Sequence, residues 1–265
     1  KNKIKAFIKS ASIAKINVSD ICLFDIIPEQ HLMHWCQVKN EICDYIFDNY
    51  DKPANHKFLS DLSEMVHEIS NREVKINHNK LFSYAPNDYK AKTLWKKFGG
   101  QESWINYNIW GTKTGRLSTK EDSFPILNLK KQIADIVVPT NNMFIQFDFN
   151  GAEIRTLLSL SGKEQPKEDI HNWNIQNIYR GIGTREKAKQ RFFAWLYNSK
   201  SEDFLTNKFY DRDKILKKYY SGGYVYTPKG RKIESDDFHA LNYLLQSVSS
   251  DNCLEQAIKI NKFLN

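Results

Sequence analysis

The chain has 265 residues, with 39 lysines and arginines against 31 aspartates and glutamates, and a formal net charge of +8. Its 16 phenylalanines, 13 tyrosines and 6 tryptophans make it rich in aromatic rings, a composition suited to partners that carry phosphates and stacked bases. No apolar run approaches the roughly 18 to 20 residues that cross a membrane, so we expect no membrane partner and a chain of one to three packed domains.

Residues 1–100 have a mostly helical pattern. Apolar side chains recur every three or four positions across 28–50 and again across 55–70, which predicts two amphipathic helices. Residues 48–55 between them contain Pro53 and turn formers, which predicts a loop.

The four cysteines form no C-x-x-C pair and no regular framework, which favours free thiols in a reducing, cytoplasmic setting. The stretch "HLMHWC" from His31 to Cys36 could be taken for a metal cluster, but its spacing matches no zinc pattern. A packed helix face is the preferred interpretation.

An apolar segment runs into a single acid at Asp148. The run at 144–147 predicts a short buried strand, and a helical pattern begins at Glu153. Asp148 would then lie at the carboxyl end of a strand, where a carboxylate and a neighbouring carbonyl can hold a divalent cation. Taken alone, an N-cap of the following helix, by Asp148 or Asn150, is the stronger interpretation.

A further helix is predicted at 184–198. Arg185, Lys189, Phe193 and Tyr197 recur every four residues, so they form one stripe of two cations followed by two rings. Such a stripe suits a nucleotide, because phosphates need donors and a base needs a flat apolar partner. For an isolated helix, a solvated basic face whose rings reach the core remains the stronger interpretation.

The stretch "GTKTGRLST" at 111–119 is a third candidate. Thr114, Gly115 and Arg116 place a flexible turn beside a guanidinium, as expected where a backbone approaches a nucleic-acid strand. By itself, an ordinary polar turn is the preferred interpretation.

Together, these segments resemble the family A DNA polymerases, the class that contains DNA polymerase I and many phage replicative polymerases. The resemblance runs from about Trp110 to the end, and six motifs occur in the family's order, which makes it specific. In chain order they are "TGRLS" (114–118), "DFNGAEIR" (148–155), "DIH" (169–171), "REKAKQRFFAWLYN" (185–198), "GGYVYTPKGRKI" (222–233) and "ALNYLLQSVSSD" (240–251).

The resemblance implies an α+β fold of the right-hand polymerase type, with a helical thumb, an antiparallel palm sheet and helical fingers. Residues 1–100 would form the thumb and an upstream remnant, and 101–165 the first part of the palm. Residues 166–222 would form the fingers, and 223–265 a truncated return from the fingers to the palm. The thumb assignment depends on position alone, because residues 1–100 contain no motif of the family.

The implied function is that of a DNA-directed DNA polymerase. A primer 3′-hydroxyl would attack the α-phosphate of a dNTP opposite a template, with two Mg²⁺ ions as cofactors. The expected partners are primer–template DNA and a dNTP, and the protein is expected to be a monomer.

The resemblance also implies roles for particular residues. Asp148 and the Phe149 carbonyl would bind metal, and Asp148 and Lys189 would be the catalytic residues, with Lys189 donating a proton to pyrophosphate. Glu153 would reject a ribose 2′-hydroxyl. The implied dNTP-binding residues are His171, Arg185, Lys189, Phe193, Tyr197 and Glu153. The implied DNA-binding residues are Thr114, Arg116, Arg155, Asn242 and Gln246.

The chain departs from the family pattern in several places. Gly151, Phe192, Ala194 and Asn198 replace a common Gln, Asn, Gly and Gly. The family's next motif, a His-Asp pair that supplies a second metal-binding carboxylate, would follow Asn265. We therefore expect a piece of a longer protein that does not polymerise efficiently alone.

Two alternatives stay open. A single-subunit RNA polymerase shares the palm and the fingers, although Glu153 and Phe193 favour DNA synthesis. A non-catalytic remnant that binds primer–template DNA without performing the chemistry is the other alternative.

Overall fold

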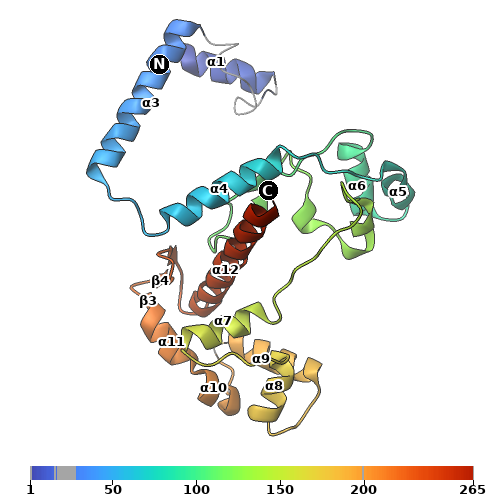
Figure 1. The fold of residues 1–265 in the computed structure, drawn as a ribbon, viewed down its shortest axis with the longest axis vertical. Coiled ribbons are helices and arrows are strands. Elements are labelled where there is room, and N and C mark those ends of the chain that lie inside the picture. The colour runs from blue at the N-terminus through green and yellow to red at the C-terminus, as the bar shows by residue number, and fades with distance from the viewer. Residues whose placement is uncertain (1, 15, 17–27, 199, 265) are drawn as a thin grey trace. The chain divides into compact units, whose positions relative to one another are not determined.

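The computed structural model describes residues 2–14, 16, 28–198 and 200–264. The chain forms two compact units, Lys1–Pro53 and Ala54–Asn265. Helices dominate, and the second unit also contains small antiparallel sheets (Figure 1). The expected α+β class is confirmed at this level.

The first unit contains α1 (Asn2–Ile13) and α3 (Glu29–Asn49), and α3 confirms the helix expected at 28–50. Leu32 is buried, whereas Trp35, Val38 and Ile42 on the same apolar stripe are exposed. The packed helix face expected for "HLMHWC" is therefore limited to Leu32, because no described helix covers the rest of the stripe. Among the residues that the structure describes, no group of three metal-ligating side chains is placed to hold an ion.

The second unit begins with the helices α4, α5 and α6 and ends with the long helix α12. Its helices are α4 (His56–Ser70), α5 (His78–Tyr84), α6 (Tyr89–Phe98), α7 (Ala152–Leu160), α8 (Ile170–Asn177), α9 (Arg185–Tyr197), α10 (Phe204–Tyr210), α11 (Arg212–Tyr219) and α12 (Ala240–Leu264), with short 3-10 turns at Ile126–Asn128 and Lys131–Ile136. None of the helices in the described part of the chain is both long and apolar enough to cross a membrane.

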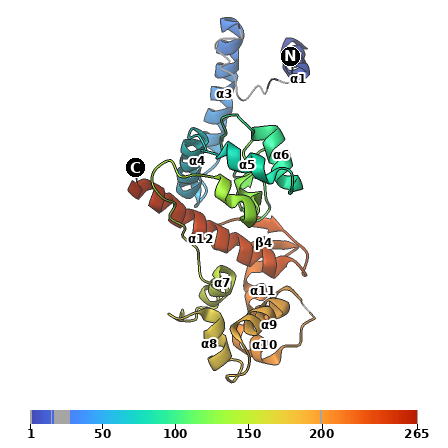
Figure 2. The same cartoon turned by 90° about the vertical axis from the view of Figure 1, so that its right-hand side faces the viewer.

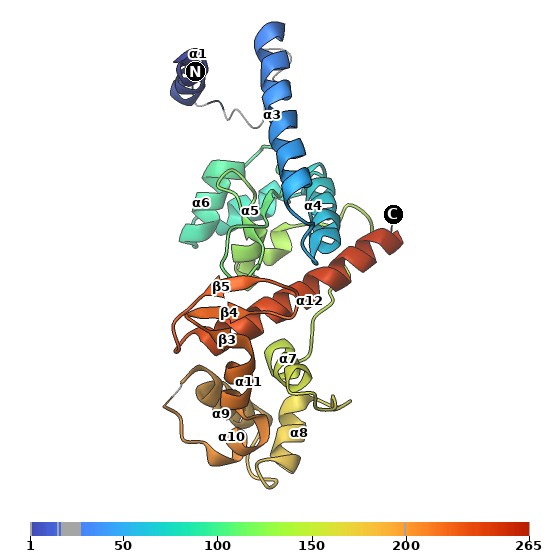
Figure 3. The same ribbon diagram turned by 90° about the vertical axis from the view of Figure 1, so that its left-hand side faces the viewer.

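Two small sheets complete the unit. The strands β1 (Tyr107–Asn108) and β2 (Ser118–Thr119) pair antiparallel, and the "GTKTGRLST" segment supplies the loop between them. The strands β3 (Tyr220–Ser221), β4 (Tyr224–Tyr226) and β5 (Lys232–Glu234) form an antiparallel sheet beside α12 (Figure 3).

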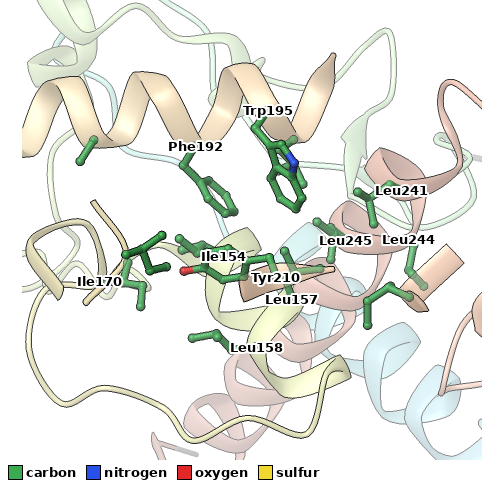
Figure 4. Packing of buried hydrophobic residues seen from close by; sticks show 14 of the residues in the cluster. Ile154, Leu157, Leu158, Ile170, Phe192, Trp195, Tyr210, Leu241, Leu244 and Leu245 are labelled. Carbon is green, nitrogen blue, oxygen red and sulfur yellow. The ribbon is translucent and has the colours of Figure 1, made fainter. Parts of the chain in front are cut away.

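Helix α12 lies between the group α4–α6 and the group α7–α11 (Figures 1 and 2). Leu62 and Met65 of α4 pack on Leu254 and Ile258 near the end of α12. The larger core forms at the other end, where Phe192, Trp195, Tyr210 and Leu244 belong to one buried cluster contributed by α7–α12 and the second sheet (Figure 4). Residues 56–98 therefore share cores with later segments, and the structure divides the chain at Pro53 instead of near residue 100.

The strand expected at 144–147 is absent. Residues 143–149 have no regular secondary structure and belong to neither sheet, and Phe144, Ile145 and Phe147 are 63–73% exposed. A strand requires a hydrogen-bonded neighbour, and no segment in the described residues pairs with this one. The palm sheet implied for Asp148 is therefore not among the sheets of this structure.

The cap of α7 also differs from the expectation. Gly151 occupies the N-cap in the left-handed region at φ 66°, and no side chain caps the helix, so the capping role considered for Asp148 and Asn150 is wrong. A Cβ at Gly151 would lie 2.7 Å from Ile170 Cγ2 and 2.9 Å from Ile154 Cγ2. This turn therefore requires glycine.

Candidate functional site

A cavity of about 580 Å³ gathers most of the predicted site residues. It is formed by the start of α7, by α8, by one face of α9 and by the loop before β2. The predicted residues that line it are Arg116, Asp148, Phe149, Glu153, His171, Arg185, Lys189 and Phe193, and Asn150, Gly151, Ala152 and Ser249 complete the wall.

Helix α9 presents two different faces. Ala188, Phe192, Trp195 and Leu196 are buried in the core, which leaves the stripe that begins at Arg185 for the cavity. The stripe residues Phe193 and Tyr197 stack, with ring centroids 5.7 Å apart and planes 8° apart. Arg185 and Lys189 are exposed and Phe193 packs against the edge of the core, as in the alternative of a solvated basic face whose rings reach the core, and all three side chains also line the cavity.

Asp169 fixes the position of Arg185. Its carboxylate caps α8 by accepting hydrogen bonds from the backbone N–H groups of His171 and Asn172, and it also binds the Arg185 guanidinium at 2.8 Å. The Arg185 guanidinium holds the pKa of Asp169 well below its usual range. The cap therefore keeps one cation of the stripe in the cavity wall. The resemblance implied a dNTP-binding role for His171 and Arg185 but did not predict the Asp169–Arg185 ion pair.

His171 is 3% exposed, and its Nδ1 is buried without a hydrogen-bond partner among the described residues. Burial lowers the pKa of the ring, Arg185 and Lys189 lower it further, and Asp169 opposes them. The imidazole is therefore neutral at pH 7. In the tautomer that carries its proton on Nδ1, this buried, unpartnered nitrogen is a donor that an anionic ligand could satisfy.

We expect an anion in this cavity to raise the pKa of His171. A bound phosphate would offset the two cations and favour the imidazolium, whereas in the free protein the depressed pKa keeps the ring neutral. NMR titration of the His171 ring protons, assigned with His171→Asn, checks this with and without pyrophosphate. An unchanged or lower pKa with saturating pyrophosphate would contradict the expectation.

For the free protein, the free energy of unfolding should fall as the pH drops below about 6.5, because His171 binds its proton more readily in the unfolded chain than in the folded one.

Glu153 is held between α9 and the loop before β2. The Tyr197 hydroxyl donates a hydrogen bond to its carboxylate, and an Arg116 nitrogen lies 3.7 Å from its other oxygen. Burial and the Glu153 carboxylate both raise the pKa of Tyr197. Glu153 is therefore a fixed part of the wall, which fits a steric role better than a role as a metal ligand.

The loop that carries Arg116 is held in place by Arg231 and Ser250. Gly115 has φ 76°, and a Cβ there would lie 2.4 Å from the Arg231 guanidinium. Arg231 forms a 2.8 Å ion pair with Asp251 of α12, whose side chain is 2% exposed, and the Ser250 hydroxyl donates to the Gly115 carbonyl. Three motifs distant in sequence thus meet at one buried contact.

Arg155 has a structural role. Its guanidinium donates to the backbone carbonyls of Asn150, Pro166 and Glu168, which ties α7 to the loop before α8. These donors are committed inside the fold, so we do not carry Arg155 forward as a DNA ligand.

The remaining predicted DNA-binding residues lie outside the cavity. Thr114 is buried in the loop before β2. Gln246 donates to the Asn242 side chain at 2.7 Å, and the two form a half-buried pair on α12.

The cavity wall contains two carboxylates, Asp148 and Glu153, and Glu153 is engaged by Tyr197 and Arg116. Mg²⁺ binds through one or two carboxylates together with substrate phosphates and water. Asp148, with the adjacent Phe149 backbone, therefore fits one Mg²⁺ that a triphosphate helps to hold. The described residues of the wall supply no further free carboxylate for a second ion.

A scan against models of known protein families matches none of them, and a search of curated proteins finds no significant match.

Proposed function

We propose that this chain is the nucleotide-binding part of a DNA-directed DNA polymerase similar to family A, which transfers a nucleotide from a dNTP to a primer 3′-hydroxyl. One observation carries the proposal. Arg185, Lys189 and Phe193 line the same cavity as Asp148 and His171, although these residues come from segments up to 45 positions apart.

The cavity has the chemistry that a nucleoside triphosphate needs. Arg185 is a cation held in the wall by Asp169 and Glu186, Lys189 is a compact cation, and His171 contributes a buried nitrogen without a partner among the described residues. Phe193, which follows on the same helix face, offers a flat apolar surface to the sugar and base, and Tyr197 stacks on it outside the cavity lining. Phosphates would therefore bind toward the start of α9 and the base toward its end.

The chain's own residues would then orient the reacting groups. Arg185 and His171 would hold the β- and γ-phosphates, and Lys189 would give its proton to the departing pyrophosphate. Asp148 and Phe149 would hold Mg²⁺, which supplies charge neutralisation at the phosphates. Glu153, kept in place by Tyr197 and Arg116, would exclude a ribose 2′-hydroxyl.

A second candidate function is primer–template binding without chemistry. The single free carboxylate of the cavity wall favours it, since two-metal transfer uses more than one. A single-subunit RNA polymerase is the third, and the fixed position of Glu153 favours dNTP over rNTP substrates.

We expect Arg185→Ala and Lys189→Ala each to weaken dNTP binding by about 10- to 100-fold, the usual size of a lost hydrogen bond to a charged group. Competition against a fluorescent dNTP measures this. Lys187→Ala is the matched control, because it removes one exposed cation from the same helix but does not line the cavity.

The corresponding nucleoside, which lacks phosphates, should bind all three variants and the unmodified chain alike. Equal dNTP affinity in the Arg185, Lys189 and Lys187 variants would overturn the assignment of the triphosphate to this cavity.

A further inference from the structure

A second cavity, of about 570 Å³, lies at the other end of α7. It is formed by the turn that follows α7 and by α10 and α11, and four lysines line it: Lys163, Lys208, Lys214 and Lys218. None of its lining residues belongs to the first cavity. Helix α7 has 9 residues, so its two ends, where the cavities lie, are about 14 Å apart.

The positive charge of this cavity is not neutralised. None of the four lysines forms an ion pair among the described residues. Asp211, the one carboxylate in the wall, caps α11 by accepting from the Lys214 backbone N–H. Four ammonium groups therefore line one cavity, and the single carboxylate in its wall already accepts a hydrogen bond from the backbone.

Lys163 is the fixed member of the four. Its ammonium lies 3.7 Å from the centre of the Phe209 ring and donates a hydrogen bond to the Phe209 carbonyl. The other three side chains are exposed. One cation is thus built into the wall, and three long side chains can adjust to a ligand.

The donor chemistry indicates what the cavity binds. Ammonium groups bind phosphate as point charges, and the wall contains no arginine fork for planar recognition. No buried, unpartnered side-chain atom of the described residues lies in this wall, so the four lysines are its main ligand-binding groups. A polymer with repeated phosphates fits four separate cations better than one small anion does.

We propose that this cavity binds the phosphodiester backbone of a single-stranded nucleic acid that also passes the first cavity. The proposal rests on the proposed function for the nature of the strand. It adds a contact surface on α10 and α11 that reads charge and not sequence.

The test compares two triple variants with the same loss of charge. Lys208→Gln/Lys214→Gln/Lys218→Gln removes the adjustable lysines of the cavity, and Lys90→Gln/Lys92→Gln/Lys96→Gln removes three exposed lysines of α6 as the matched control. Anisotropy of a labelled single-stranded oligonucleotide, measured across salt concentrations, gives the slope of log affinity against log salt. Each single-strand phosphate contact contributes about 0.7 to that slope.

We expect the cavity variant to lower the slope by about 2 and the affinity at 0.1 M salt at least tenfold, with little change in the control. The Lys→Arg version of the same triple should restore the slope, because it keeps the charges. Thermal melting of each variant shows whether the fold is retained.

Two results would overturn the proposal. One is an equal fall of the slope in the α6 control, which would show a general effect of net charge. The other is an unchanged slope in the cavity variant, and if that variant also loses thermal stabilisation by pyrophosphate, the cavity would be assigned to a small phosphate. Either result would leave the dNTP effects of Arg185→Ala and Lys189→Ala intact, so the failure of this proposal is distinguishable from the failure of the proposed function.

Discussion

Replacing Asp251 with alanine is expected to lower the free energy of unfolding of the second unit by about 3 kcal/mol, the low end of the range for breaking a buried ion pair. The variant would leave the Arg231 guanidinium, whose side chain is 19% exposed, without its carboxylate. Arg231 also supports Gly115, so the loop that carries Arg116 should lose its anchor in the same variant.

Glu255→Ala is the matched control, one turn further along α12. Glu255 pairs with Lys229 at 2.7 Å, but both side chains are more exposed, and such pairs contribute about 0 to 1 kcal/mol. Urea unfolding monitored by tryptophan fluorescence compares the two variants. If Asp251→Ala cost no more than Glu255→Ala, Asp251 would not be the buried anchor of the loop.

Replacing Asp148 with asparagine is expected to lower the rate of nucleotide transfer by about 1000-fold, or ~4 kcal/mol in the barrier. Asparagine keeps the size of the side chain but removes the only carboxylate of the cavity wall that Tyr197 and Arg116 do not engage. The exposed 143–149 segment carries Asp148, so the change should leave the folded core intact. DNA affinity should hardly change, because backbone phosphates dominate binding.

Asp122→Asn provides the control for Asp148→Asn. Asp122 is 87% exposed and lies outside the cavity, so its loss of charge is the same but its rate should be unchanged.

Local patterns were sufficient to predict some of the helices. The spacing of apolar residues predicted α3 and α4, and the helix predicted at 184–198 is α9, which the Thr184 side chain caps by accepting from the Lys187 backbone N–H. Such features depend on residues a few positions apart, and these are visible in the sequence.

The failures share a non-local cause. The run at 144–147 has the composition of a strand, but a strand also needs a partner that local composition cannot supply. The N-cap of α7 was assigned to a side chain, whereas the packing of Ile170 and Ile154 around Gly151 explains why a glycine stands there.

The site was predicted only in part. The resemblance grouped Asp148, Glu153, His171 and the α9 stripe, and all of these residues except Tyr197 line one cavity. The Asp169–Arg185 and Arg231–Asp251 pairs join residues 16 and 20 positions apart, and no periodicity marks such pairs.

The lysines of the second cavity were also missed. They come from separate elements, and each alone looks like an ordinary solvated charge.

Template-directed synthesis is tested most directly by primer extension with the full-length protein, each of the four dNTPs offered singly against each template base. We predict that the unmodified protein adds only the complementary dNTP, that it strongly disfavours the matching rNTP, and that Asp148→Asn is about 1000-fold slower while Asp122→Asn is not. Extension by Asp148→Asn at the unmodified rate, or addition that ignores the template base, would contradict the assignment of this cavity to template-directed DNA synthesis.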